Sequence, residues 1–447
     1  MITDSIASDP IYKDSLPSDF LHGYSSASYQ IEGGYQQDGR GLSNWDVYLK
    51  DRDNGNDAVD SYNRWKEDVR LLKQYGCNVY RFSISWSRVK PLGGKDDPVN
   101  EKGIQYYSDL IDALLEAGIE PFVTIYHWDL PLKLQERYNG FSTLDSSLIV
   151  QDFAAYSKLL FERFGDRVRD WITINEPHAV TIMSSTGLVP DWSMKTSPWI
   201  MSKNLLLCHA NTVDLYRREF QAQQGGQIGI TLDCDWFEPI DDSPEAKTCA
   251  EQGVAYFLGW FADPVYKGHL NPLLKEQIGD NYPDFSPDEW KLVKGSSDLQ
   301  VSIFRSSSLN HGLKYDTQAK LRDDATLQDK FEFFCGNIEV TPRGKDGTMI
   351  GNEGNLAQVY DVPWGFRKVL QHVYKEYAKP SGIKIYVTEN GFTITGETKM
   401  TTAERVNDVQ RQTYFNGYIK QLINAVREDG MPVAGYMGWS LLDNLEW

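Results

Sequence analysis

Cysteine is scarce in this chain, and its spacing excludes two kinds of site. The 447 residues include five cysteines, and no two of them form a C-x-x-C pair. A sparse, odd-numbered set of this kind lacks the ligand spacing of a zinc site and the even count of a disulfide framework. We therefore expect reduced thiols, no bound metal and no other cofactor.

Long apolar runs and an excess of basic residues are also missing. No stretch approaches the roughly 20 apolar residues that a membrane-spanning helix requires. Lys and Arg total 45 against 63 Asp and Glu, which gives a formal net charge of −18. Because such a surface repels phosphate backbones and anionic lipids, the sequence predicts neither nucleic-acid nor membrane partners.

The first fourteen residues lack the basic and apolar regions of a secretory signal peptide, since they are polar and acidic. No N-x-S/T glycosylation sequence occurs in the chain. Together with the sparse cysteines, these features predict a cytoplasmic location.

Aromatic residues, in contrast, are abundant: 13 Trp, 25 Tyr and 19 Phe. Rings in such number serve either a bulky core or a carbohydrate cleft, where flat rings pack on the apolar faces of sugars. Composition alone leaves these two interpretations equally open.

Short β-rich segments alternate with amphipathic segments along almost the whole chain. Nearly continuous apolar runs, typical of parallel strands covered on both faces, occupy 20–25, 78–84, 121–126, 168–175, 227–232, 383–389 and 433–439, with a poorly formed one near 298–310. Helical spacing of apolar residues lies between them, as at 58, 62, 65, 69 and 72 and at 104, 107, 111 and 114.

This alternation predicts an α/β fold with a parallel sheet. A doubly wound sheet is the alternative, but the glycine-rich phosphate loop expected after its first strand is missing. Eight strands favour a closed (β/α)8 TIM barrel. The absence of an inter-domain linker predicts one catalytic domain over residues 1–447.

Two of the predicted strands, the fourth and the seventh, end in a glutamate followed by a turn signal. The segments are T-I-N-E-P at 173–177 and Y-V-T-E-N-G at 386–391. Chemistry in a TIM barrel occurs at the carboxyl ends of the strands. One glutamate there is most often a solvated cap or an ion-pair partner, but glycoside hydrolysis requires two carboxyl groups, about 5–5.5 Å apart in retaining enzymes.

The chain resembles glycoside hydrolase family 1, the β-glucosidase family, from about Leu16 to Trp447. Six motifs carry the resemblance in the family's order: F-L-H-G-Y-S-S-A-S-Y-Q-I-E-G (20–33), Y-R-F-S-I-S-W-S-R (80–88), Y-H-W-D-L-P (126–131), T-I-N-E-P, Y-V-T-E-N-G and W-S-L-L-D-N-L-E-W (439–447). The resemblance implies a retaining β-glucosidase in which Glu176 is the acid/base and Glu389 the nucleophile.

The resemblance also implies a set of supporting residues. Sugar hydroxyls or rings are expected to contact Gln30, His127, Trp128, Asn175, Trp439, Glu446 and Trp447. Arg81 corresponds to the cation that the family places against the nucleophile, where it would keep Glu389 ionised. Taken singly, His127 and Trp128 fit a core role better, and Arg81 fits an ordinary buried ion pair.

Two positions narrow the expected substrate. Relatives acting on 6-phosphorylated sugars have a serine and a lysine in the loop after the eighth strand, where this chain has Glu446 and Trp447. The Glu446 carboxylate would repel a sugar phosphate. Glu176 stands where thioglucosidases have glutamine, which favours O-glycosides. We expect β-glucosides and short cello-oligosaccharides as substrates, with β-galactosides and β-fucosides as side substrates. The segments at 99–112 and 361–368 are most similar to those of fungal cytoplasmic members.

Two departures from the family pattern stand beside these matches. After Ser296-Ser297-Asp298 the chain has the run L-Q-V-S-I-F-R-S-S-S in place of the family pattern, which predicts an interrupted sixth strand. The family's tyrosine near the nucleophile is missing from its place, and Tyr315 is out of register by several residues. The chain ends at Trp447 without the family's final helix, which predicts a barrel with an exposed apolar flank. An alternative is therefore a catalytically impaired or non-catalytic sugar-binding relative, encoded by a wrongly assembled or decayed gene.

Overall fold

Eight parallel strands form a closed barrel in the computed structural model, which describes residues 16–314, 334, 336, 338–355 and 359–447. Each strand pairs with the next, and the β6–β10, β10–β11 and β11–β1 pairings close the circle. The strands are β1 (Leu21–Ser25), β2 (Val79–Ser83), β3 (Glu120–Tyr126), β4 (Asp170–Asn175), β5 (Gln227–Pro239), β6 (Gln300–Lys314), β10 (Ile385–Glu389) and β11 (Val433–Trp439). The predicted TIM barrel is confirmed.

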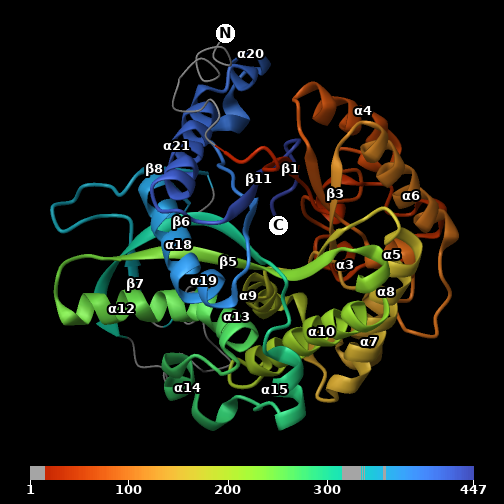
Figure 1. Ribbon diagram of the computed structural model, residues 1–447, viewed down its shortest axis with the longest axis horizontal. Helices are drawn as coiled ribbons and strands as arrows, with labels where there is room; N and C mark the ends of the chain where they lie inside the picture. The colour runs from red at the N-terminus through yellow and green to blue at the C-terminus, as the bar shows by residue number, and fades with distance from the viewer. Residues whose placement is uncertain (1–15, 315–333, 335, 337, 356–358) are drawn as a thin grey trace.

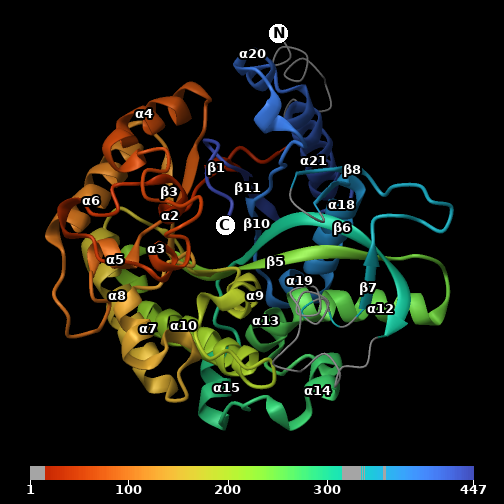
Figure 2. The ribbon, with the colours of Figure 1, turned by 180° about the vertical axis from the view of Figure 1, so that it is seen from behind.

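Helices surround most of the barrel in both views and leave one side open (Figures 1 and 2). The longer ones are α4 (Ser61–Gln74), α6 (Glu101–Glu116), α8 (Ser146–Phe164), α10 (Ser197–Glu219), α12 (Pro244–Val254), α18 (Pro363–Val373) and α21 (Val409–Arg427). Shorter ones include α2 (Ser28–Ile31), α3 (Asn44–Tyr48), α5 (Trp86–Val89), α7 (Leu132–Tyr138), α9 (Pro177–Met183), α13 (Trp260–Ala262), α14 (Pro272–Ile278), α15 (Pro287–Val293), α19 (Lys379–Ser381) and α20 (Thr402–Val406).

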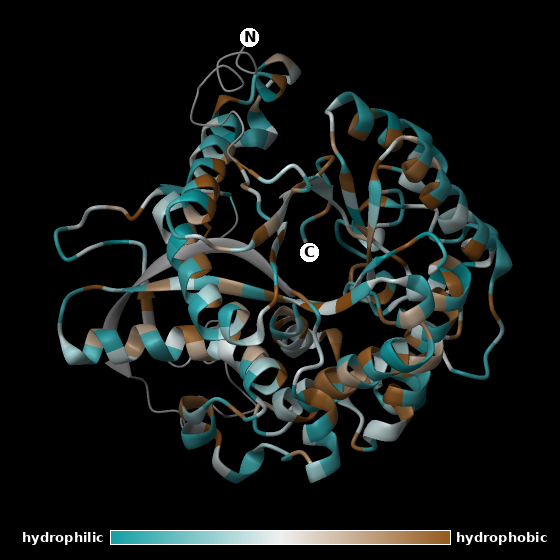
Figure 3. Ribbon diagram, viewed as in Figure 1, coloured by the Kyte–Doolittle hydropathy of each residue, from teal (hydrophilic) through white to brown (hydrophobic). Residues whose placement is uncertain are grey.

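The helical periodicity in the sequence marks the faces that pack on the barrel. In α6 the four residues Ile104, Tyr107, Ile111 and Leu114 are all buried, as their spacing predicts. The stripe predicted from residue 58 begins later, because α4 starts at Ser61. Hydropathy colouring shows the hydrophilic residues on the outer sides of these helices (Figure 3).

The prediction of an interrupted sixth strand was wrong. β6 runs without a break for 15 residues and pairs with β10 over Gln300–Ile303 and with β5 as far as Asn310. Beyond the barrel, β5 and β6 continue together as a long ribbon, to which β7 (Ile338–Thr341) adds an antiparallel strand (Figure 1). A long ribbon can accommodate the unusual run without breaking the barrel. Tyr315 lies outside the described residues.

The barrel interior is layered. Its amino-terminal floor is an apolar cluster of six buried residues, Val79, Phe122, Ile172, Leu299, Tyr386 and Met437. Successive residues on one face of a strand are two apart, so the next inward positions on β2 and β3 are Arg81 and Thr124. A polar layer therefore lies directly on the apolar floor, toward the carboxyl ends of the strands.

The flank formed by β1 and β11 is more exposed than the neighbouring barrel wall, in line with the prediction. Leu21, Tyr24 and Ala434 are only half-buried, whereas every residue of β2 is buried. Tyr24 packs against Tyr75 with 6.1 Å between ring centroids, and Tyr75 is itself exposed. After β11, residues 440–447 fold back over the barrel mouth, where the C-terminus lies near the centre of the molecule (Figure 2). None of the helices in the described ranges has both the length and the apolar character needed to cross a bilayer.

A buried ion pair outside the barrel mouth gives the first test of the fold. Arg88 of α5 and Glu32 join at 2.7 Å with almost no exposed side-chain surface, and Tyr107 donates to the same carboxylate at 2.5 Å. Replacing Arg88 by Met leaves Glu32 buried without its cation, so the free energy of unfolding should fall by about 3–5 kcal/mol in urea denaturation.

The double variant Glu32→Gln/Arg88→Met is the control, because it removes both charges and should recover part of the loss. An Arg88→Met protein as stable as the unchanged one would contradict this account of the packing.

Candidate active site

Glu176 and Glu389 end the fourth and seventh strands of the barrel, as predicted, and both side chains are at least nine-tenths buried. Glu176 adopts a left-handed backbone conformation (φ 45°, ψ 67°) immediately before α9. A non-glycine residue persists there only when its surroundings hold it. Its N–H donates to Thr231 O and its carbonyl accepts from Val180 N, both at 2.9 Å.

Arg81 connects the two carboxylates through one intervening side chain. It is fully buried, and its Nη1 pairs with Glu389 Oε1. Its Nη2 donates to Asn175 Oδ1 at 2.5 Å, and Asn175 Nδ2 donates in turn to Glu176 Oε2 at 3.0 Å. Thr124 Oγ1, in the polar layer, accepts from Arg81 Nε at 2.9 Å and orients the guanidinium.

This arrangement also determines a histidine tautomer. Because Arg81 only donates, the Asn175 oxygen must face it and the Asn175 amide hydrogens must point the other way. Asn175 Nδ2 lies 3.1 Å from His127 Nε2, which must then accept, so the proton of a neutral His127 is on Nδ1. His127 thus presents Nδ1 as a donor.

The E-N-G segment after β10 is fixed by its neighbours. Asn390 accepts from Tyr436 Oη at 2.6 Å and donates to Tyr414 Oη at 2.8 Å. Gly391 passes so close to the carbonyl of Trp439 that a Cβ would overlap it. Glycine is required at this position because the chain after β10 approaches the end of β11 here, where Trp439 N also donates to Asn390 O at 2.8 Å.

Aromatic side chains wall the mouth. Trp128, with a left-handed φ of 76°, donates from Nε1 to Asn175 O at 3.1 Å. Trp447 packs against Trp128 and Trp45, with centroid separations of 4.9 and 4.4 Å. Trp439 stacks on His127 at 6.0 Å. The predicted indoles thus come from two distant parts of the chain, and Trp45, which was not predicted, adds a third.

The remaining predicted residues, Gln30 and Glu446, organise the segment after β11. Buried Gln30 donates from Nε2 to Asn444 Oδ1 and to the carbonyl of Leu445, at 3.0 and 2.6 Å. Exposed Glu446 accepts from Trp439 Nε1 at 2.6 Å. Both therefore lie at the mouth, where Gln30 holds the segment and Glu446 forms its outer rim.

Asp129 was missed in the sequence although it belongs to the Y-H-W-D-L-P motif. It is completely buried directly after Trp128, and it accepts from Ser28 Oγ at 3.1 Å. Burial raises the pKa of Asp129 to about 7, against the opposing effect of Arg40. A carboxyl group that changes charge near neutrality therefore supports both the Trp128 loop and the segment that carries Gln30.

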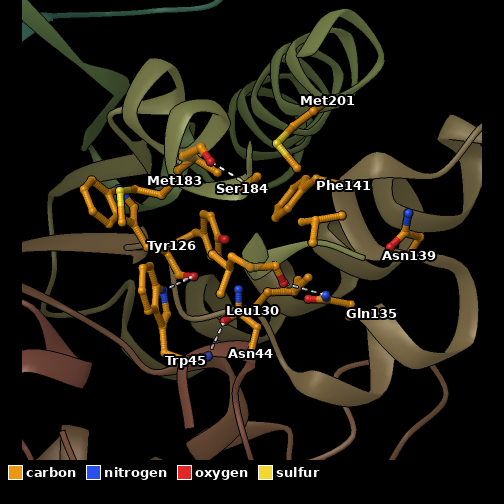
Figure 4. Close-up of a pocket in the computed structure, with 14 residues that line it drawn as sticks. Asn44, Trp45, Tyr126, Leu130, Gln135, Asn139, Phe141, Met183, Ser184 and Met201 are labelled. Atoms are coloured by element: carbon orange, nitrogen blue, oxygen red, sulfur yellow. Dashed lines mark hydrogen bonds between the residues drawn. The ribbon is translucent and has the colours of Figure 1, made fainter. Parts of the chain in front are cut away.

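A separate pocket lies behind Trp128 rather than at the carboxylates. It is lined mainly by apolar side chains of β3, α9 and the following turn, together with Trp45, whose Nε1 donates to Trp128 O at 3.1 Å (Figure 4). Glu176, Glu389 and Arg81 do not line it. The two carboxylates and Arg81 therefore lie outside this pocket, at the ends of the strands.

The described residues contain no group of three or more His, Cys, Asp or Glu side chains placed to hold a metal ion. The site instead has two buried carboxylates linked through a guanidinium, beneath an aromatic rim at the carboxyl ends of barrel strands. A pair of carboxylates in such a barrel defines a glycoside hydrolase.

Comparison with known proteins gives the family. The model of glycosyl hydrolase family 1 matches residues 12–447. Beta-glucosidase 1B of Phanerodontia chrysosporium is 47% identical, with 97% of this chain and 80% of that protein covered. Two solved fungal β-glucosidases superpose over 97% of this chain. The Trichoderma harzianum enzyme is 41% identical, with a TM-score of 0.89 and 90% of its own chain covered. The Humicola insolens enzyme in complex with glucose is 40% identical, with a TM-score of 0.90 and 91% of its own chain covered.

The chain therefore belongs to glycosyl hydrolase family 1. It is an enzyme of the retaining β-glycosidase type, as the six motifs predicted.

Asp129 provides a pH test of the site. Its folded-state pKa of about 7 exceeds the value of about 4 of an unfolded chain, so its contribution favours folding at low pH and is lost as the pH rises through 7. Relative to Asp129→Asn, which cannot ionise, the unchanged protein should lose stability between pH 5 and pH 8.

Between pH 5 and the folded-state pKa of about 7, two pKa units correspond to about 3 kcal/mol. Denaturant titrations of both proteins at the two pH values measure the difference. Parallel stability profiles would show that Asp129 does not titrate in this range.

Proposed function

We propose that this enzyme removes terminal β-D-glucosyl residues from β-glucosides, with Glu389 as nucleophile and Glu176 as acid/base, in a single catalytic domain spanning residues 1–447. The observation that carries the proposal is the asymmetry of the two carboxylates. Glu389 pairs directly with the Arg81 cation, whereas Glu176 accepts from the neutral amide of Asn175. An adjacent cation favours the ionised form, so Glu389 is the group suited to attack.

In the first step, a Glu389 oxygen attacks the anomeric carbon from the face opposite the aglycone. The bond from that carbon to the glycosidic oxygen breaks, and Glu176 transfers its proton to the departing oxygen. The products are the free alcohol and a glucosyl ester on Glu389. Arg81 pairs with the Glu389 carboxylate before the attack and keeps it oriented.

In the second step, Glu176, now ionised, takes a proton from water as the water oxygen attacks the anomeric carbon. The ester bond to Glu389 breaks, which regenerates the carboxylate and releases glucose with its original anomeric configuration. Both steps use one carboxyl oxygen of Glu389 and one of Glu176. The Glu176 oxygen must stay in place between the steps, so the backbone of Glu176 has to be fixed by its neighbours.

Sugar recognition is proposed to use the polar and aromatic residues of the mouth. Asn175 would contact the 2-hydroxyl, a contact that strengthens in the transition state. The other residues proposed to contact the sugar are Gln30, His127, Trp128, Trp439, Glu446 and Trp447. The positions of Gln30 and Glu446 support this role, because each already binds part of the rim.

Short cello-oligosaccharides and aryl glucosides are the proposed substrates, and a cytoplasmic location is proposed with them. The solved Humicola insolens relative holds glucose, which supports a glucosyl specificity. Cys77, Cys208, Cys234 and Cys249 are free thiols, as in proteins of a reducing compartment. Fractionation of source cells tests the location, and activity recovered only in the medium would overturn it.

The nucleophile is tested with p-nitrophenyl β-D-glucoside. The purified chain should release nitrophenol, and Glu389→Gln should reduce kcat by about 10⁴-fold or more, because the amide cannot form the glucosyl ester. Substantial turnover by that variant would exclude Glu389, and silence from the unchanged protein would leave a sugar-binding relative.

The acid is tested by varying the leaving group. In Glu176→Gln, kcat/KM for cellobiose should fall by about 10²- to 10⁴-fold. The same constant for 2,4-dinitrophenyl β-D-glucoside should change little, because this leaving group departs without a proton. Equal losses on the two substrates would reverse the assignment.

A further inference from the structure

A buried histidine–aspartate pair lies two residues beyond Glu176. His178 is in the first turn of α9, and its Nδ1 is 2.9 Å from Asp233 Oδ2 on β5. The exposed fractions of the two side chains are 1% and 5%. The His178 ring is enclosed by aromatic rings, with Phe257, Trp260 and Phe334 at centroid distances of 4.5, 5.8 and 6.3 Å.

Both ring nitrogens of His178 face oxygen atoms. Nε2 lies 3.2 Å from the carbonyl oxygen of Phe334, and Nδ1 lies 2.9 Å from the carboxyl oxygen of Asp233. The ring is therefore held on two sides, by the segment around Phe334 and by β5.

The pair is mechanically connected to Glu176. Thr231 O accepts the Glu176 N–H at 2.9 Å, and Asp233 follows Thr231 by two residues, on the same face of β5. The segment Glu176–His178 is thus attached to β5 at both ends, by a backbone hydrogen bond and by the histidine. Between the two attachments the chain turns through the left-handed conformation of Glu176.

We propose that His178 is a positioning residue for Glu176, and that its hydrogen bond with Asp233 holds the start of α9 against β5 so that the Glu176 carboxyl group faces the glycosidic oxygen. The inference rests on the proposed function, in which Glu176 is the acid. It assigns His178 no contact with substrate. In a low-dielectric aromatic enclosure, a hydrogen bond is electrostatically stronger than the same bond in water.

The hydrogen bond is measured without activity. In protein labelled with ¹⁵N at its seven histidines, the His178 signals are assigned by their loss in His178→Phe. We expect a His178 ring proton that exchanges slowly with water, because the ring is buried and hydrogen-bonded. Exchange as fast as in Asp233→Ala would overturn the proposal.

The positioning role is measured with Asp233→Ala, which removes the hydrogen-bond partner of His178 Nδ1 on β5. The loss of this attachment should loosen the start of α9. We expect kcat/KM for cellobiose to fall by roughly 10- to 100-fold, within the range of general-acid catalysis. The loss on 2,4-dinitrophenyl β-D-glucoside should be less than about threefold.

Asp263→Ala is the matched control. Asp263 is equally buried, accepts from Tyr377 Oη and Asn271 Nδ2 at 2.9 and 2.7 Å, and pairs with Lys267 at 3.0 Å. It lies toward the opposite end of the barrel, since nearby Tyr266 bonds to the carbonyl of Leu299, just before β6 begins. Any effect of the control on kcat/KM should be the same for both substrates.

Equal losses on the two substrates in a folded Asp233→Ala protein would overturn the positioning role. If Asp233→Ala does not fold, His178→Gln is measured in the same way, with the same two expected results. Inactivity of the unchanged protein on both substrates would instead refute the proposed function, and the nitrogen spectrum would still show whether His178 is hydrogen-bonded.

Discussion

The ion pair between Arg81 and Glu389 is the interaction on which the rest of the site depends. Arg81 has no exposed surface. A charge in such a place is tolerated only when it is paired and its remaining hydrogens are bonded, and removal of one partner from such a pair typically costs 3–5 kcal/mol. Thr124, Asn175 and the carbonyl of Thr388 accept the other hydrogens of Arg81. The polar layer above the apolar floor exists to satisfy this cation.

From that constraint the geometry of the reaction follows. Asn175 is oriented by Arg81, and it then orients both His127 and Glu176 through its two amide hydrogens. The carboxylates thereby differ in their surroundings, one beside a cation and the other beside a neutral amide. Two groups of the same type can perform two different roles because their environments separate them.

Much of the fold could be predicted from the sequence. Seven strands were visible as apolar runs because parallel strands are buried on both faces, and the two glutamates stood at strand ends with turn signals behind them. The length of β6 could not be predicted, since its partner is a continuation of β5 beyond the barrel rather than the barrel itself. An isolated run that is rich in serine gives no sign of a partner 70 residues away.

The supporting side chains were predictable only where a motif contains them. Asp129 lies within a recognised motif, yet its role depends on complete burial, which local sequence does not report. His178 follows T-I-N-E-P directly, but its pairing with Asp233 arises from the three-dimensional register of α9 on β5. The Trp45–Trp128–Trp447 cluster likewise joins residues separated by hundreds of positions.

The most direct measurement is to trap the glucosyl ester. Incubation with 2,4-dinitrophenyl 2-deoxy-2-fluoro-β-D-glucoside, followed by peptide mass spectrometry, locates any sugar bound covalently to the enzyme. The account predicts one fluoroglucosyl group on Glu389, since this carboxylate is ionised beside Arg81 and the fluorine slows release. Attachment to a different residue, or turnover without any covalent intermediate and with inversion at the anomeric carbon, would contradict it.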